Sequence, residues 1–267
     1  MKSASKPGRA NPIGDFQKYI SELRRRVAQG DLSAMCDLGL WLQEGFQDKK
    51  GRSVPRSNPG YSFRLLKAAV EGGYKEAAFP LAYAYDVGLG TRRNRPQAVR
   101  WYTVDYWNGR SGGAANLAVI YRDLGDLRRA FAWWMRAAAL DDGDAVDAGY
   151  CYQYGIGVRR NVASARRLFR RAIGARDISM WDREESLYHL AITYLDADKP
   201  KLAVPLLKRA ALDGDYPEAA AVLRQLVAKE VAEPCRCRRF IIKTLRGHAV
   251  CAIHPKRTGH HKTAKPH

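Results

Sequence analysis

The sequence predicts an all-α protein, a right-handed solenoid of antiparallel helix pairs. Three observations favour this fold. Small residues, large apolar residues and turn residues recur along the chain at intervals of 31 to 43 residues. Within each interval they stand three or four positions apart, which places them on one face of a helix. Glycines, often followed by Asp, separate the apolar stretches, as is typical of a helix end followed by a new N-cap.

A small residue followed three positions later by a large one marks the first helix of each unit. The pairs are Gly39/Leu42, Ala82/Tyr85, Ala118/Tyr121, Gly149/Tyr152 and Ala191/Tyr194. The second helix is marked by a small residue with a large anchor four positions later. These pairs are Ser62/Leu66, Ala98/Tyr102, Ala130/Trp134, Ala165/Phe169 and Ala203/Leu207. Small residues let helices approach closely and the anchors fill the layer between them, so each unit buries its apolar face against its neighbours.

The array is flanked by two segments of different composition. Residues 1–14 are expected to be a basic, flexible N-terminus, and residues 15–30 a capping helix with an apolar stripe of Phe16, Tyr19, Ile20, Leu23 and Val27. The repeat array is expected over residues 31–230, as five full units and a truncated sixth, with an insert over residues 47–60 of the first unit. Residues 231–267 form a basic, Cys- and His-rich C-terminal segment. Pro80 and Pro205 fall inside predicted helices, where proline kinks a helix or delays its start.

The repeating residues resemble the Sel-1-like repeat family, a relative of tetratricopeptide repeats. The fourth unit carries Ala148-Gly149, Tyr152, Gly155-Ile156-Gly157-Val158, Ala165, Leu168-Phe169 and Ala172. The second carries Ala82, Tyr85, Gly88-Leu89-Gly90, Ala98 and Trp101-Tyr102. The resemblance spans about residues 31–226. It implies a helical solenoid that binds another macromolecule.

Charge is concentrated at the two ends of the chain. The formal net charge is +19, of which residues 1–26 carry +5 and residues 234–267 carry +9. Such ends attract acidic partners, and the alternative is a solvated tail that only aids solubility. The sequence contains no apolar run long enough to span a membrane and no apolar stretch near its start, which predicts a cytoplasmic protein. Five cysteines without secretory context indicate reduced thiols or a metal site rather than disulfides.

No catalytic motif is apparent, so the chain is predicted not to be an enzyme. Gly88-x-Gly90 and Gly155-x-Gly157 lie between predicted helices and lack the rest of a phosphate-binding loop. Cys36 and Cys151 occupy small-residue positions and are expected to act as small hydrophobic residues.

The C-terminal segment contains a candidate zinc site. Two apolar runs around Gly247 predict a short β-ribbon, with Cys235 and Cys237 at one end and Cys251 and His254 at the other. Three thiolates and one imidazole suit tetrahedral structural zinc and leave no open catalytic position. The alternative has three reduced cysteines, with Phe240, Ile242 and Val250 packing against the last helix.

Two sets of side chains are candidates for partner binding. The first is a basic patch, which could neutralise phosphates or an acidic protein face; its members are Arg159, Arg160, Arg166, Arg167, Arg170 and Arg171. The second is aromatic, Trp41, Tyr83 and Tyr150 on first helices, which could line a concave groove. The alternatives are a solvated outer face for the arginines and packing between repeats for the aromatics.

The predicted function is a non-catalytic protein-binding scaffold whose partner presents an acidic surface. The family resemblance sharpens this to a bacterial immunity or chaperone-like protein for a secreted effector or toxin. Apart from the possible zinc, no cofactor is expected. The alternative is nucleic-acid binding through the Arg166–Arg171 helix, the insert at residues 47–60 and the C-terminal segment, which would be steeply salt-dependent.

Overall fold

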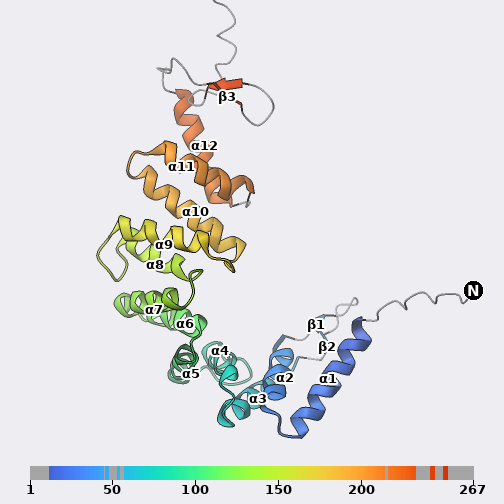
Figure 1. Cartoon of the computed structure of the whole chain (residues 1–267). Helices are drawn as coiled ribbons and strands as arrows, with labels where there is room; N and C mark the ends of the chain where they lie inside the picture. Colours follow the sequence, from blue (N-terminus) through green and yellow to red (C-terminus); the bar gives the residue numbers. More distant parts are fainter. Residues whose placement is uncertain are drawn as a thin grey trace, which may run out of the picture. The chain divides into compact units, whose positions relative to one another are not determined.

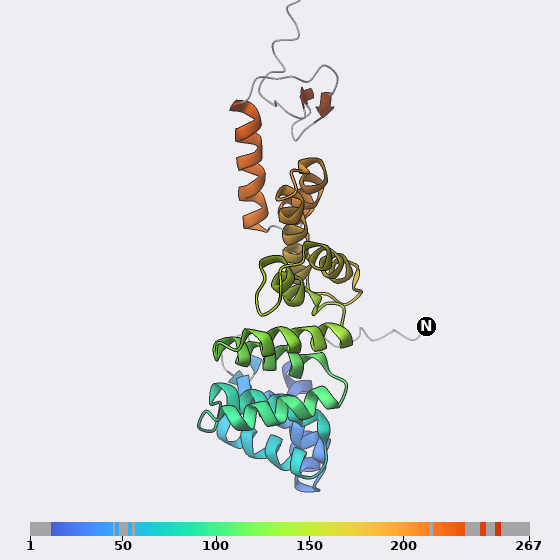
Figure 2. The same cartoon turned by 90° about the vertical axis from the view of Figure 1, so that its left-hand side faces the viewer.

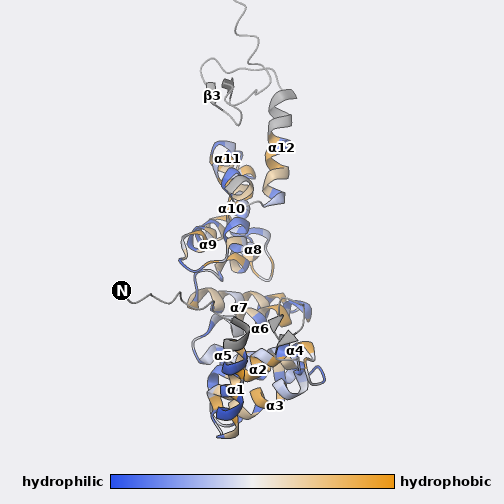
Figure 3. Ribbon diagram, turned by 90° about the vertical axis from the view of Figure 1, so that its right-hand side faces the viewer, coloured by the Kyte–Doolittle hydropathy of each residue, from blue (hydrophilic) through white to orange (hydrophobic). Residues whose placement is uncertain are grey.

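A computed structural model describes residues 12–44, 46–47, 53–54, 57–213, 216–232, 241–243 and 249–251 of the chain. The chain divides into two compact units, with the division between Asp141 and Asp142. Both are built mainly from consecutive helices (Figure 1). Hydrophobic and hydrophilic residues are mixed along the individual helices (Figure 3).

The first unit contains an N-terminal helix and three helix pairs. Helix α1 (Pro12–Ala28) packs on α2 (Leu32–Glu44), which pairs with α3 (Pro59–Glu71). The short helix η1 (Lys75–Ala77) precedes α4 (Ala78–Val87), which pairs with α5 (Arg95–Trp107). Helix α6 (Ser111–Asp123) pairs with α7 (Leu127–Leu140), and α4 to α7 lie side by side (Figure 2). Between α2 and α3, β1 (Phe46–Gln47) pairs antiparallel with β2 (Ser53–Val54).

The second unit continues the same construction. Helix α8 (Ala145–Tyr154) pairs with α9 (Val162–Gly174), and α10 (Met180–Leu195) contacts both α9 and α11 (Pro200–Lys208). A π-helical turn, η2 (Arg209–Asp213), follows α11 and precedes α12 (Pro217–Ala232). Beyond α12, β3 (Ile241–Lys243) pairs antiparallel with β4 (Ala249–Cys251).

One backbone hydrogen bond recurs in every helix pair and closes the turn between the two helices. The carbonyl of the large residue in each first-helix motif accepts the N–H of the residue that precedes the second helix, at 2.8–2.9 Å. These bonds run from Asn58 to Leu42, Asn94 to Tyr85, Asp126 to Tyr121, Asn161 to Tyr152 and Lys199 to Tyr194. In the first four pairs the same Asn or Asp also caps the second helix, because its side chain accepts a backbone N–H three residues later.

The sequence-predicted anchors form the interior of each helix pair. All ten small and large anchors of the second helices are at most 5% exposed. A Cβ placed on Gly39 would lie 3.0 Å from the Leu66 side chain, and one on Gly149 would lie 2.7 Å from the Phe169 ring. Glycine is therefore needed in these first helices because the anchor of the second helix occupies the space of a side chain.

In the N-terminal helix, Ile20 and Leu23 are buried against α2, whereas Tyr19 of the predicted stripe is exposed. Asp31 caps α2 as the Gly-Asp pattern predicts, since its Oδ1 accepts the N–H groups of Ser33 and Ala34. Asp144 makes no such bond to the first turn of α8, because its backbone is not extended there.

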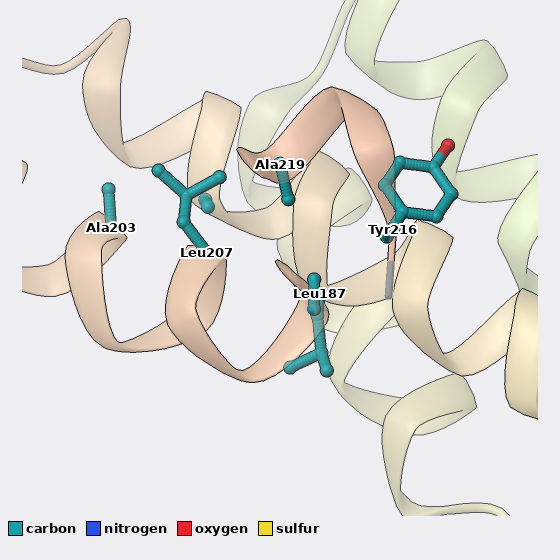
Figure 4. Packing of buried hydrophobic residues seen from close by; sticks show 7 residues of the cluster. Leu187, Ala203, Leu207, Tyr216 and Ala219 are labelled. Carbon is teal, nitrogen blue, oxygen red and sulfur yellow. The ribbon is translucent and has the colours of Figure 1, made fainter. Parts of the chain in front are cut away.

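The two prolines affect their helices differently. Pro80 lies in the first turn of α4, where a backbone N–H has no partner within the helix, and the helix is uninterrupted. Pro205 lies inside α11, which passes into the π-helical turn η2 four residues later. The core of this region joins three elements: Leu187 of α10, Ala203 and Leu207 of α11, and Ala219 of α12 (Figure 4).

Candidate functional site

A groove opens on the first helices of the first unit. Side chains of α2, α4 and the start of α6, with the end of α7, enclose about 650 Å³. Its apolar lining consists of Leu40, Phe79, Pro80, Tyr83 and Leu140. We call this space the first-helix groove. Leu40, Tyr83 and Leu140 are each between 42% and 46% exposed, so the groove presents apolar surface to solvent. Its volume lies within the range of about 300–1,000 Å³ found for ligand sites.

Two of these exposed residues occupy the same position in the repeat. Leu40 directly follows Gly39, and Tyr83 directly follows Ala82. The small residue faces the second helix of its pair. The residue that follows it lies about 100° further around the first helix and therefore points away from the second helix. The corresponding residues of the other units are Val119, Tyr150 and Ile192. Sequence analysis selected Tyr83 and Tyr150 but missed Leu40, which the repeat register identifies because this position is apolar in all five units.

The polar end of the groove is built around a buried carboxylate. Asp105 of α5 is fully buried, and its Oδ2 accepts the Gly113 N–H at 3.0 Å. It substitutes for the missing N-cap of α6, because the residue before that helix, Arg110, makes no capping bond. Burial raises the pKa of Asp105, and the Arg110 guanidinium and the Gly113 N–H partly offset this effect.

Arg110 connects this carboxylate to the neighbouring pair of helices. Its Nη1 lies 3.7 Å from Asp105 Oδ1 and donates to the Glu76 carbonyl oxygen at 3.4 Å. Its Nη2 lies 3.4 Å from Glu76 Oε1. The guanidinium is therefore held in place beside the apolar lining, where it can hydrogen-bond a bound chain without first being ordered.

The other two predicted aromatic residues lie elsewhere. Trp41 is half-buried and packs edge-on against Phe16 of α1, with ring centroids 4.9 Å apart, so it belongs to the core between α1 and α2. Tyr150 belongs to the second unit. Its ring lies 4.6 Å from that of Tyr154 and 5.1 Å from that of the buried His189. Of the three predicted aromatics, Tyr83 is the one that lines the first-helix groove.

Four of the six predicted arginines have partners within the second unit. Arg166 donates to the hydroxyl and carbonyl oxygens of Thr193, and Arg170 donates to the Tyr194 hydroxyl. Two others form ion pairs, Arg160 with Asp196 at 3.5 Å and Arg171 with Asp142 at 2.6 Å. Arg159 and Arg167 are exposed and have no ion pair among the described residues. A role in partner binding stays a prediction for the whole set.

The two cysteines of the helix pairs are structural. Cys36 and Cys151 are both buried, and desolvation raises their thiol pKa values to about 11 and about 12. Such thiols stay protonated near neutral pH and are poor nucleophiles. Among the described residues, no group of three or more His, Cys, Asp and Glu side chains could hold a metal ion. Cys235, Cys237 and His254 and the side chain of Cys251 lie outside the described part, so zinc binding there stays a prediction.

None of the described helices is both long and apolar enough to cross a membrane.

No curated protein matches the chain significantly. Solved structures do match it, and two of them each share 20% sequence identity with this chain. A Sel1 repeat protein from Oxalobacter formigenes has a TM-score of 0.64, with 81% of this chain and 86% of that one covered. A protective antigen with an SLR fold, present in uropathogenic Escherichia coli strains, has a TM-score of 0.54, with 80% of this chain and 52% of that one covered.

At this identity the two structures establish the fold. The Sel1 repeat model matches residues 32–74, 75–103, 113–142 and 145–175. Each matched segment covers all or most of one helix pair: α2 with α3, α4 with α5, α6 with α7, and α8 with α9. The chain therefore belongs to the Sel1 repeat family.

Proposed function

We propose that this protein is a protein-binding scaffold and that its first-helix groove receives an apolar segment of the partner. The observation that carries the proposal is the exposed apolar lining, in particular Leu40 and Tyr83 at the same position of consecutive repeats. Sel1 repeats are generally non-catalytic and bind other proteins. Contiguous exposed apolar surface edged by polar groups is typical of protein interaction sites.

The size of the expected effect follows from the groove itself. Transferring a Leu-sized side chain from water into an apolar contact is worth about 1.5–3 kcal/mol. Tyr and Arg are the residue types most enriched among side chains that dominate binding energies, and Tyr83 and Arg110 both line the groove. Introducing a carboxylate at Leu40 and Tyr83 removes this apolar contact and adds a charge that must be desolvated on binding. The loss should reach at least about tenfold in affinity, or 1.4 kcal/mol.

The finer assignment rests on the resemblance alone. We propose that the partner is a secreted effector or toxin of a bacterium, and that this chain binds it in the cytoplasm as an immunity or chaperone-like protein. The net charge of +19 suits a partner with an acidic surface, because opposite charges attract. This attraction accelerates the encounter of the two proteins more than it tightens their complex.

The experiment is affinity capture from native lysate, with nuclease and high-salt treatment of parallel portions. We expect one stoichiometric protein to survive both treatments and to be lost with Leu40→Asp/Tyr83→Asp. Leu124→Asp is the matched control, since Leu124 is 57% exposed, belongs to the same unit and does not line the groove. Equal capture by both variants would contradict the assignment of the groove. Recovery of nuclease-sensitive material alone, lost at high salt, would instead favour nucleic-acid binding.

A further inference from the structure

A second groove lies in the second unit, between α9, α10 and α11. It encloses about 330 Å³. Its walls are apolar, and the residues that form them are Ile173, Leu187, Leu190, Tyr194, Leu202, Pro205 and Leu206. Of the described residues that line it, the charged ones are Arg170 of α9 and Arg209 of η2. We call this space the second-unit groove.

The groove follows a seam between two core clusters. Ile173, Tyr194 and Leu206 pack against both the cluster around Phe169 and the cluster around Leu207. Pro205 lies at this seam and has no N–H for the helix, and α11 gives way to the wider π-helical turn that carries Arg209. Such turns occur frequently at functional sites. Leu202, one turn before Leu206, is 50% exposed, so part of the lining remains open to solvent.

One of the two arginines is fixed beside the apolar lining. Arg170 donates a hydrogen bond to the Tyr194 hydroxyl. The Tyr194 ring is covered on its face by the Arg166 guanidinium, 4.4 Å from the centroid, and Arg166 is itself held by the Thr193 side chain and carbonyl oxygen. Arg170 is thereby oriented without an acidic partner in the described part of the chain, so its charge is available to a ligand.

The charge balance distinguishes this groove from its surroundings. Arg160 and Arg171 are paired with Asp196 and Asp142, whereas Arg170 and Arg209 have no ion pair among the described residues. Two guanidinium groups that have no acidic partner among the described residues, beside an apolar channel, complement a ligand that combines carboxylates with apolar side chains. A volume near the lower end of the range for ligand sites, about 300–1,000 Å³, accommodates a few side chains of an extended segment.

We propose that the second-unit groove binds a short acidic segment of a partner protein, in which apolar residues alternate with Asp or Glu. The apolar side chains lie on Leu202 and Leu206, and the carboxylates bind Arg170 and Arg209. Guanidinium groups match carboxylates through two parallel hydrogen bonds, which sets the register of the segment. This site is separate from the first-helix groove, so the proposal does not depend on the function assigned to that groove.

The test measures fluorescence anisotropy of the full chain with a fluorescein-labelled peptide amide of alternating Asp and Leu. We expect saturable binding to the wild type. Binding should be at least tenfold weaker for Arg209→Gln, which removes an exposed charge without a described partner, and for Leu202→Ser. Arg167→Gln is the matched control, because Arg167 is exposed on the same helix as Arg170 but does not line the groove. Its affinity should stay within twofold of the wild type.

Peptide variants and competitors separate the alternatives. Replacing Leu by Ser or Asp by Ser should each reduce binding at least tenfold. Equal affinity of Arg209→Gln and wild type, or equal losses in Arg209→Gln and Arg167→Gln, would overturn the proposal. Two other results would overturn it in favour of diffuse electrostatic attraction. One is equal binding of the peptide in which Leu is replaced by Ser. The other is full displacement of the original peptide by an oligothymidylate of equal charge. Leu40→Asp/Tyr83→Asp should leave peptide binding unchanged, which separates this site from the first-helix groove.

Discussion

The contact between α5 and α6 depends on the absence of a side chain at Gly113. A Cβ on this residue would lie far inside van der Waals contact with the Tyr102 carbonyl oxygen, and 2.9 Å from Asp105 Oδ2. The obstacle is the backbone of α5 rather than the end of a flexible side chain. Gly113→Ala therefore requires the two helices to move apart at the polar end of the first-helix groove.

Two opposing effects decide the sign of this substitution. Replacing Gly by Ala inside a helix contributes about 1 kcal/mol of stability through backbone entropy. Overpacking a buried contact costs about 1–3 kcal/mol. Separation of the helices also weakens the 3.0 Å hydrogen bond from Gly113 to the Asp105 carboxylate, and a hydrogen bond to a charged group contributes about 1.5–3 kcal/mol. We expect a net destabilisation of about 2 kcal/mol.

Urea unfolding followed by far-UV circular dichroism measures the net effect, and hydrogen exchange of α5 and α6 locates it, since repeat arrays can unfold in parts. Gly60→Ala is the matched control in the same unit. A Cβ on Gly60 would meet nothing closer than Asn58 Oδ1 at 3.9 Å, so this variant should be neutral or slightly stabilised. A midpoint for Gly113→Ala at or above that of the wild type would refute the reasoning.

Two further predictions follow from the buried carboxylate and the C-terminal segment. Because burial raises the pKa of Asp105 in the folded state, the folded chain binds this proton more tightly than the unfolded chain, and its contribution to stability falls as pH rises above the ordinary value of 3.8. Asp105→Asn should thus gain stability relative to the wild type between pH 4 and pH 7 in paired urea titrations, and a difference independent of pH would contradict this account. Protein purified without chelators should contain about one zinc ion per chain by elemental analysis, and the Cys237→Ser variant should lose it. Wild-type protein that contains no metal would contradict the zinc prediction.

Local patterns account for the parts of the fold that sequence analysis anticipated. Small and large residues four positions apart share a helix face whatever the tertiary structure, and the anchors from Leu66 to Leu207 are buried as their spacing predicts. The Asn caps of the second helices are equally local, but sequence analysis did not identify them, although Asn58, Asn94 and Asn161 each precede an apolar run. The β1–β2 pair was not anticipated, because a two-residue strand has no periodicity to detect.

The candidate sites were less predictable because exposure and pairing depend on how helices dock. Trp41 and Tyr83 lie one residue apart in the repeat register, yet Trp41 packs against α1 while Tyr83 lines a groove. The arginines of α9 look equivalent in the sequence. Docking of α10 gives Arg166 two oxygen acceptors at Thr193, whereas Arg167 has no ion pair in the described part of the chain.

The sequence by itself determined the repeat and the pairing of first and second helices, because both follow from residues a few positions apart along one chain. Only the tertiary structure decided which apolar residues stay exposed and which charges stay uncompensated. Leu40, Tyr83 and Leu140 meet in one groove, and Arg170 and Arg209 line another, although no short-range pattern connects them. A groove is defined by several helices at once, and their relative placement is the sum of many packing contacts that no single helix encodes.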